Sequence, residues 1–125
     1  MTTLIFDVEA NGLLDTIDTI WCIGITDAKG GPVDIYTDHD SDYRPLQEGL
    51  DRLSAADTVV AHNGLGYDLQ AINMLYPNTL RFEQMYDTMV AGMLAEPERR
   101  SHAIKSYGEQ FKAPTLFCAP MARYR

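Results

Sequence analysis

The chain has 125 residues, of which 46% are hydrophobic, and a formal net charge of −8 at pH 7. This length suits one domain with a single core. The acidic balance argues against a broad basic surface that grips duplex DNA through its phosphates. No apolar run approaches the roughly 20 residues that a membrane span needs, and the N-terminus lacks the pattern of a signal peptide. We therefore expect a cytoplasmic domain without a membrane partner.

Three short segments at the N-terminus predict an antiparallel meander. Residues 3–10 and 19–28 are apolar and contain β-branched side chains, as buried strands do. An Asn-Gly pair marks a turn after the first of them. A hairpin signal at residues 29–31 separates the second strand from a third, over residues 32–37.

Helical and extended patterns alternate in the middle of the chain. Residues 45–53 have apolar side chains at a helical period, and residues 57–62 form a short apolar run typical of a strand buried on both faces. A second helical face extends over residues 65–76. Residues 84–87 then predict a short fifth strand.

Two further helices are predicted after this strand. Asp87 has the position of an N-cap for a helix over residues 88–96, which a proline ends. Ser101 has the same position before a helix over residues 102–112. The sequence beyond that helix has no clear period.

The element order β-β-β-α-β-α-β-α-α predicts an α/β fold in which a mixed five-stranded sheet is flanked by helices. This is the strand inventory of the ribonuclease H-like fold. We expect residues 1–112 to form this domain and residues 113–125 to form an irregular tail.

Two carboxylates lie close together in the first predicted strand. Asp7 and Glu9 are two residues apart, so the alternation of a strand points both side chains to one face. Carboxylates at that spacing repel each other unless a cation joins them. Polar residues on the wet face of an edge strand would give the same pattern, although the neighbouring residues look apolar enough to be buried. Metal ligation and a solvated strand face both remain open for this pair.

Asp68 adds a third carboxylate. It lies after the fourth predicted strand, in the first turn of the next helix, where the helix dipole alone would also favour an acid. The first and fourth strands are expected to be neighbours at a switch in strand order, a place where ligands gather in α/β sheets. Together, Asp7, Glu9 and Asp68 suit one or two Mg²⁺ or Mn²⁺ ions, roughly 3.5–4 Å apart where there are two.

Four segments of the chain match motifs of a known family. They are FDVEANGLL (6–14), AHNGLGYDL (61–69), MYDT (85–88) and SHAIKSYGEQF (101–111). They resemble the 3′–5′ proofreading exonuclease domain of phage-type family A DNA polymerases, which belongs to the DEDD superfamily. The resemblance extends from Thr3 to about Lys112. It implies a ribonuclease H-like fold and the hydrolysis of single-stranded DNA from its 3′ end.

The resemblance also implies roles for particular residues. The catalytic, metal-binding carboxylates would be Asp7, Glu9 and Asp68. Asn63 and Tyr67 match residues that line the cleft for the single strand, and Leu13 matches an apolar residue that packs on the 3′-terminal base. Structural alternatives are a turn position for Asn63 and core positions for Tyr67 and Leu13.

The implied reaction is metal-assisted hydrolysis of the last phosphodiester, with two Mg²⁺ or Mn²⁺ ions in a complete site. One ion would activate water, and the other would stabilise the leaving 3′ oxygen. The product would be a nucleoside monophosphate. The implied partners are the 3′ end of single-stranded DNA and a polymerase domain, and a phage-encoded chain would act in the cytoplasm of its bacterial host.

The third motif of this family is missing from the sequence. That motif is a tyrosine or histidine followed a few residues later by aspartate, but no aspartate follows Asp87, and His102 and Tyr107 lack the spacing. Three explanations stay open. The chain is a fragment interrupted before the motif, or a stand-alone nuclease that takes its fourth ligand from Glu109, a partner subunit or water. Otherwise it is a catalytically silent nucleic-acid- or protein-binding module on the same fold.

A chain with three of the four carboxylates should bind metal but hydrolyse DNA slowly or not at all in isolation. The loss of one carboxylate weakens the second metal position more than the first, because three ligands remain. A polymerase domain or another subunit that supplies the missing motif would restore the reaction.

Overall fold

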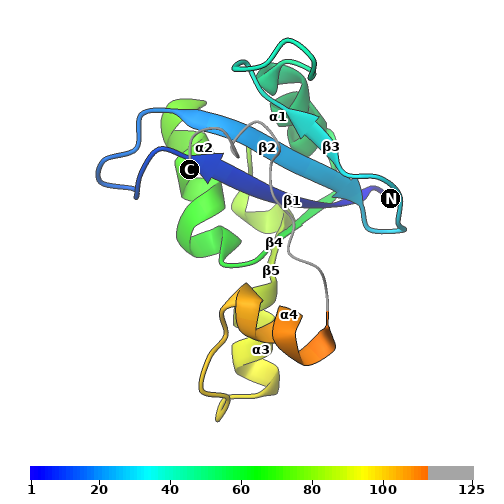
Figure 1. Ribbon diagram of the computed structural model, residues 1–125, viewed down its shortest axis with the longest axis vertical. Coiled ribbons are helices and arrows are strands. Elements are labelled where there is room, and N and C mark those ends of the chain that lie inside the picture. The colour runs from blue at the N-terminus through cyan, green and yellow to red at the C-terminus, as the bar shows by residue number, and fades with distance from the viewer. Residues whose placement is uncertain (113–125) are drawn as a thin grey trace.

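The computed structural model describes residues 1–112 of the chain (Figure 1). Its sheet has the strand order β3-β2-β1-β4-β5. The strands are β1 (Thr3–Ala10), β2 (Ile20–Asp27), β3 (Asp34–Tyr36), β4 (Thr58–Ala61) and β5 (Met85–Asp87). β1 lies at the centre, antiparallel to β2 and parallel to β4. The predicted mixed five-stranded sheet is therefore confirmed, whereas the predicted tail over 113–125 lies outside the described residues.

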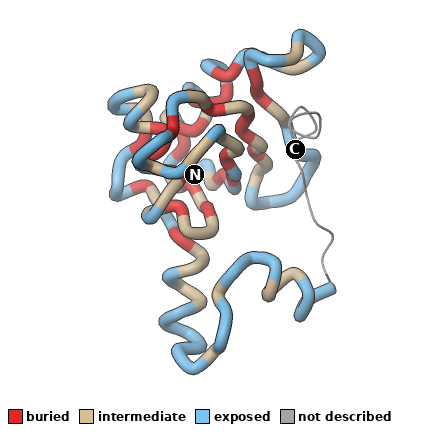
Figure 2. Tube along the Cα trace, turned by 60° about the vertical axis from the view of Figure 1, so that its left-hand side comes forward, coloured by how far each residue is buried: buried red, intermediate tan, exposed pale blue. Residues whose placement is uncertain are grey.

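Two helices pack against the same face of this sheet. They are α1 (Leu46–Ala55) and α2 (Leu69–Leu75). Their buried residues Leu50 and Ile72 belong to one core cluster with Phe6 and Val8 of β1. Alternate residues of β1 are buried because the strand turns every second side chain toward these helices. In Figure 2, the buried stretches gather in this part of the molecule.

The connection between β4 and α2 differs from the prediction of one helix over residues 65–76. Residues Gly64–Asp68 form a π-helical turn, η1, and α2 begins only at Leu69. Asn63 precedes η1 with φ 58°, a left-handed conformation that asparagine tolerates better than most residues. A wide turn of this kind has no signature in apolar periodicity, so the pattern predicted an ordinary helix.

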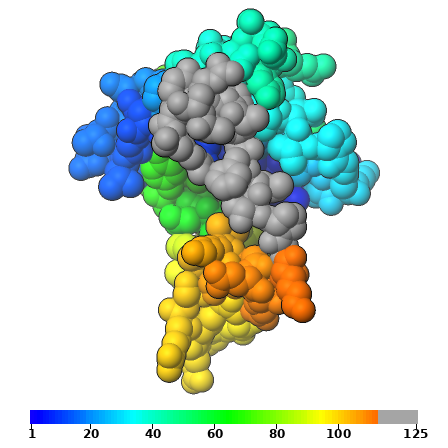
Figure 3. All heavy atoms as spheres, in the orientation of Figure 1, coloured from blue at the N-terminus to red at the C-terminus, as the bar shows by residue number. Residues whose placement is uncertain are grey.

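The last two described helices extend away from the sheet. α3 (Thr88–Ala95) continues from β5, and α4 (Ile104–Phe111) packs beside it. Neither helix has a buried residue, and both lie beneath the rest of the molecule in Figure 3, in yellow and orange. No helix within residues 1–112 is long and apolar enough to cross a membrane.

The two predicted N-caps have different outcomes. Asp87 caps α3 as predicted, since its carboxylate accepts hydrogen bonds from the backbone N–H groups of Met89 and Val90. The prediction for Ser101 is wrong: α4 begins at Ile104, and its N-cap is Ala103, without a side-chain cap. The Ser101 hydroxyl instead accepts a hydrogen bond from the N–H of Ala103, at 3.3 Å.

Candidate active site

The two carboxylates of β1 lie on the face of the strand that points away from the core. Phe6 and Val8 are buried, whereas Asp7 is exposed and Glu9 is half-buried. Asp7 pairs with Gly24 of β2. Because glycine has no side chain, this neighbour does not cover the Asp7 carboxylate. The central strand thus presents two acidic groups on one open face, in the arrangement that the spacing predicts.

Asp68 reaches this strand from the π-helical turn. The side chain of Asp87 holds the start of the turn, because its two carboxylate oxygens accept hydrogen bonds from the N–H of Asn63 at 2.9 Å and of Leu65 at 3.0 Å. The turn then ends at Asp68, which is 4% exposed. One Asp68 carboxylate oxygen accepts a hydrogen bond from the N–H of Val8, at 3.2 Å. The sequence element after β4 is therefore fixed directly against the middle of β1.

The position of Asp68 makes its ionisation unfavourable. Burial raises its pKa to about 7, and the negative charge of Asp7 acts in the same direction. The hydrogen bond from Val8 opposes this rise in pKa by stabilising the charged form. A bound cation would stabilise the ionised form of Asp68, because its positive charge offsets both the burial of the carboxylate and the repulsion from Asp7.

Tyr67 joins η1 to the loop between β1 and β2. Its hydroxyl donates a hydrogen bond to the carbonyl oxygen of Gly12, at 2.6 Å. Burial raises the pKa of this hydroxyl, and the charges of Asp68 and Glu9 raise it further. The phenol is consequently a stable donor at neutral pH. It lies within electrostatic range of two of the three candidate carboxylates.

Asn11 fixes the base of the same loop. Its side-chain oxygen accepts hydrogen bonds from the N–H groups of Asp18 and Thr19, both at 3.1 Å, and its amide donates to the Asp18 carboxylate. Hydrogen bonds from Thr19 and Asn11 lower the pKa of Asp18. The Asn11 side chain therefore joins the start of the loop after β1 to its end at Asp18 and Thr19, just before β2.

A hollow open to solvent lies between this loop and η1. It has a volume of about 700 Å³, and its lining residues are Leu13, Leu14, Asp15, Asn63, Gly66 and Tyr67. All three residues predicted to contact substrate, Leu13, Asn63 and Tyr67, are among them. Leu13 is 72% exposed, which excludes the alternative that it is a core residue. Sequence reasoning missed the contribution of the other three, because nothing in their pattern distinguishes them from an ordinary turn.

The donors at this site fit a hard divalent cation in their chemistry, since Mg²⁺ and Mn²⁺ prefer carboxylate oxygens. The structure fixes Asp68 against the N–H of Val8, the residue after Asp7, and Glu9 lies on the same strand face as Asp7. Within residues 1–112, however, no group of three or more Asp, Glu, His or Cys side chains is arranged to hold a metal ion. Metal ligation by the three carboxylates therefore stays a prediction.

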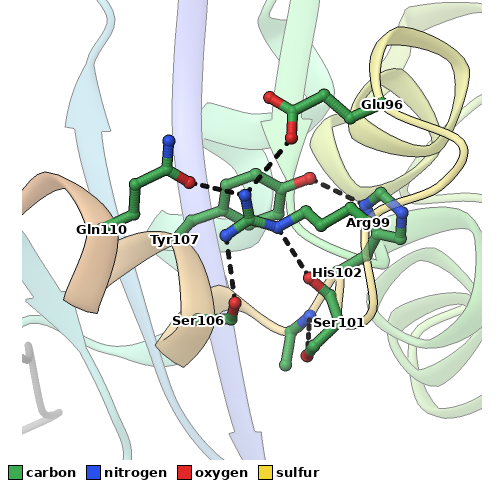
Figure 4. Close-up of polar contacts among 8 residues, drawn as sticks. Glu96, Arg99, Ser101, His102, Ser106, Tyr107 and Gln110 are labelled. Atoms are coloured by element: carbon green, nitrogen blue, oxygen red, sulfur yellow. Dashed lines mark hydrogen bonds and ion pairs between the residues drawn. The ribbon is translucent and has the colours of Figure 1, made fainter.

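The residues near the position of the missing motif bond to one another across α4 and the segment that connects it to α3 (Figure 4). The Tyr107 hydroxyl lies 2.7 Å from Nδ1 of His102, and the Arg99 guanidinium lies 3.9 Å above the Tyr107 ring. Glu109 is exposed on α4. His62, which follows β4, connects this region to the sheet, because its Nε2 donates a hydrogen bond to the carbonyl oxygen of His102 at 2.5 Å.

A mixed sheet with acidic residues on its central strand, and a third acid at the end of the turn that follows the neighbouring strand, is the arrangement of a nuclease-like domain. The family model described as "RNase_H superfamily" matches residues 4–111. The chain belongs to this superfamily. The ribonuclease H-like fold expected from the element order is thereby confirmed.

Individual relatives are more distant. The chain is 25% identical, over 88% of its length, to DNA polymerase III PolC-type of Bacillus subtilis (strain 168), and it spans 10% of that protein. Among solved structures, it resembles NrnC of Brucella melitensis with a TM-score of 0.67 and 16% identity, over 93% of this chain and 55% of that one. Related structures of NrnC contain bound Mg²⁺ or pGG. The chain thus spans a tenth of the first relative and about half of the second.

Proposed function

We propose that this domain is a metal-dependent 3′–5′ exonuclease that hydrolyses single-stranded DNA 3′ ends to nucleoside monophosphates. The observation that carries the proposal is the position of the buried Asp68 carboxylate, which accepts a hydrogen bond from the N–H of Val8, the residue after Asp7 on β1. This contact lies at the junction of β1 and η1, and the hollow lined by Leu13, Asn63 and Tyr67 involves the same turn. Mg²⁺ bound to an NrnC structure and the name of the polymerase relative support the same class of activity.

Each group has a defined part in this reaction. Asp7, Glu9 and Asp68 would hold one or two Mg²⁺ or Mn²⁺ ions, which supply an activated water and stabilise developing negative charge. The exposed Leu13 would pack on the terminal base. Tyr67 links η1 to the loop that carries Leu13, because its hydroxyl donates a hydrogen bond to the carbonyl oxygen of Gly12. Asn63, which lines the same hollow, would contact the single strand there.

A second candidate is a catalytically silent module that binds nucleic acid or protein on this fold. It is favoured by the finding that residues 1–112 do not bring three metal ligands together. The resemblance to phage-type polymerases gives a third candidate function, in which the domain acts together with a polymerase. A polymerase domain, or another subunit, would supply the missing aspartate, and the domain would then proofread during DNA replication.

One experiment separates these functions. Mn²⁺ is titrated while the melting temperature is followed, and release of mononucleotides from 3′-labelled single-stranded DNA and RNA is measured on the same preparation. An exonuclease should show metal stabilisation and release, and Asp7→Asn should remove both. Metal stabilisation without release identifies the silent module. The absence of both effects would refute the metal site itself.

A further inference from the structure

The helix α4 begins beside the candidate active site. β4 lies parallel to β1, and His62 connects β4 to Asn63, which lines the hollow of the candidate site. His62 donates a hydrogen bond from Nε2 to the carbonyl oxygen of His102, just before α4. From this contact the helix runs for eight residues, over Ile104–Phe111. At about 1.5 Å per residue, the helix is roughly 12 Å long.

Positive charge is concentrated on this part of an acidic chain. All but three of the 18 acidic residues precede residue 96, whereas four of the ten basic residues lie in segment 96–112. Within residues 1–112, the ion pairs involve Arg44, Arg52 and Arg99. Arg100, Lys105 and Lys112 are exposed and form no ion pair with a described residue. Lys105 lies within α4, Lys112 follows its last residue, and Arg100 precedes it.

An exposed aromatic ring accompanies these charges. The Phe111 ring stacks on the Tyr107 ring at 10° between planes and 6.5 Å between centroids, and the Arg99 guanidinium lies over Tyr107. Hydrogen bonds from Arg99 to Ser106 and Gln110 hold this guanidinium in place. Phe111 is nevertheless 69% exposed. A preorganised ring that stays in solvent is a surface on which a planar group can stack.

We propose that the outer surface of α4 binds the single strand of nucleic acid whose 3′ end reaches the carboxylates. This α4 surface consists of Ile104, Lys105, Phe111 and Lys112. Its composition matches single-strand binding, in which bases stack on aromatic rings while cations follow the phosphates. Glu109 lies on the same surface and opposes the interaction. The inference rests on the proposed function for the direction of the strand, but its binding test does not require hydrolysis.

The charge component is tested by the salt dependence of binding. Fluorescence anisotropy of a 5′-labelled oligothymidylate is measured with the full chain in EDTA, where a metal-dependent nuclease cannot act. Lys105→Glu and Lys112→Glu should each weaken binding and reduce the slope of log K against log salt by about 0.7, the value for one lost single-strand phosphate contact. Lys29→Glu, an exposed lysine in the turn after β2, changes the net charge equally and should leave the slope unchanged. Glu109→Gln should strengthen binding.

The stacking component has a closely matched control. Phe111→Ala should weaken binding about fivefold or more, which corresponds to the lower end of measured base-stacking contributions. Phe111→Tyr should retain the affinity of the original chain. Phe82→Ala removes a ring of nearly equal exposure, 68%, from the short helical turn η2 (Phe82–Gln84). This control should leave binding unchanged.

Failure of this proposal differs from failure of the proposed function. Binding that depends on α4, without any release of mononucleotides in Mg²⁺ or Mn²⁺, would refute the exonuclease and support the α4 surface. Release of mononucleotides, with all α4 variants binding like the original chain, would support the exonuclease and refute the α4 surface. No binding by the unaltered chain would also overturn the α4 surface. A third outcome would also overturn it. If light scattering showed that Phe111→Ala changes the oligomeric state while binding is unaffected, the ring would serve a contact between proteins.

Discussion

Asp68 is a buried carboxyl group whose charge is costly in the folded protein. Its pKa rises from 3.8 to about 7, chiefly through burial and then through the charge of Asp7. The folded state therefore binds more protons than the unfolded state between about pH 4 and pH 7. The stability that this proton contributes is fully present below the unfolded pKa and is lost as pH rises through the folded pKa.

A comparison with Asp68→Asn isolates this effect. In EDTA, the free energy of unfolding of the unaltered chain should fall relative to the variant by on the order of 3 kcal/mol between pH 4 and pH 8. Urea denaturation at several pH values measures it. Asp42→Asn, which changes an exposed loop carboxylate, should follow the unaltered chain at every pH. Parallel pH profiles for Asp68→Asn and the unaltered chain would contradict the raised pKa.

Tyr67 permits a second test at the scale of one side chain. Tyr67→Phe removes the hydroxyl that bonds to Gly12 and leaves the ring in place. We expect a loss of about 1 kcal/mol of stability, the usual net contribution of one hydrogen bond. If the nuclease function holds, KM for single-stranded DNA should rise more than kcat falls, because the loop carrying Leu13 is loosened while the carboxylates are untouched. An unchanged KM would show that the loop does not need this bond.

At the scale of elements, Asp87 organises two of them at once. Its carboxylate accepts hydrogen bonds from Asn63 and Leu65 in the turn before α2, and from Met89 and Val90 in the first turn of α3. The side chain is 6% exposed. Removing it would leave several partly buried N–H groups without this acceptor, and each such loss is costly.

We therefore expect Asp87→Ala to destabilise the fold by about 2–4 kcal/mol, more than the loss of an ordinary N-cap. Urea denaturation provides the measurement. Asp87→Asn, which keeps an oxygen acceptor, should cost less. Because Asp87 also holds the turn that ends at Asp68, amide exchange of residues 63–68 should accelerate in the alanine variant and much less in the asparagine variant. Exchange in this turn at the rate of the unaltered chain would show that the turn does not depend on Asp87.

How far the sequence predicts these elements depends on the range of the interactions involved. Alternation in β1 places Asp7 and Glu9 on one face, and the Asp87 cap is a local signal, so both could be predicted. The π-helical turn at Gly64–Asp68 could not, because it is stabilised by Asp87, more than 20 positions along the chain. The predicted start of α4 was wrong for a similar reason. Ser101 has the right residue type for an N-cap, but the segment before α4 is held by hydrogen bonds of Arg99 to Ser106 and Gln110 and by the bond from His62 to His102.

The whole molecule consists of a packed sheet and a less buried helical extension. The core cluster and the side chains packed against it include no residue of α3 or α4, and both helices extend away from the sheet in Figure 1. The Tyr107 hydroxyl of α4 lies close to Gly92 of α3, and the Tyr107 side chain is held by His102 and covered by Arg99 from the segment between the two helices. Regions with little buried apolar surface open locally at lower free energy than the core. Helix α4 should therefore be able to detach from α3 and unfold locally while the sheet stays folded.

Gly92 provides the means to test this division. A Cβ atom at this position of α3 would meet the Tyr107 hydroxyl, so Gly92→Ala should displace the ring and separate α4 from α3. Hydrogen exchange should then accelerate in residues 104–111 and remain unchanged in β1 and β4. Ala95→Ser, an exposed change on the same helix, serves as the control. Faster exchange throughout the sheet would contradict the division, because it would show that the extension and the sheet unfold as one cooperative unit.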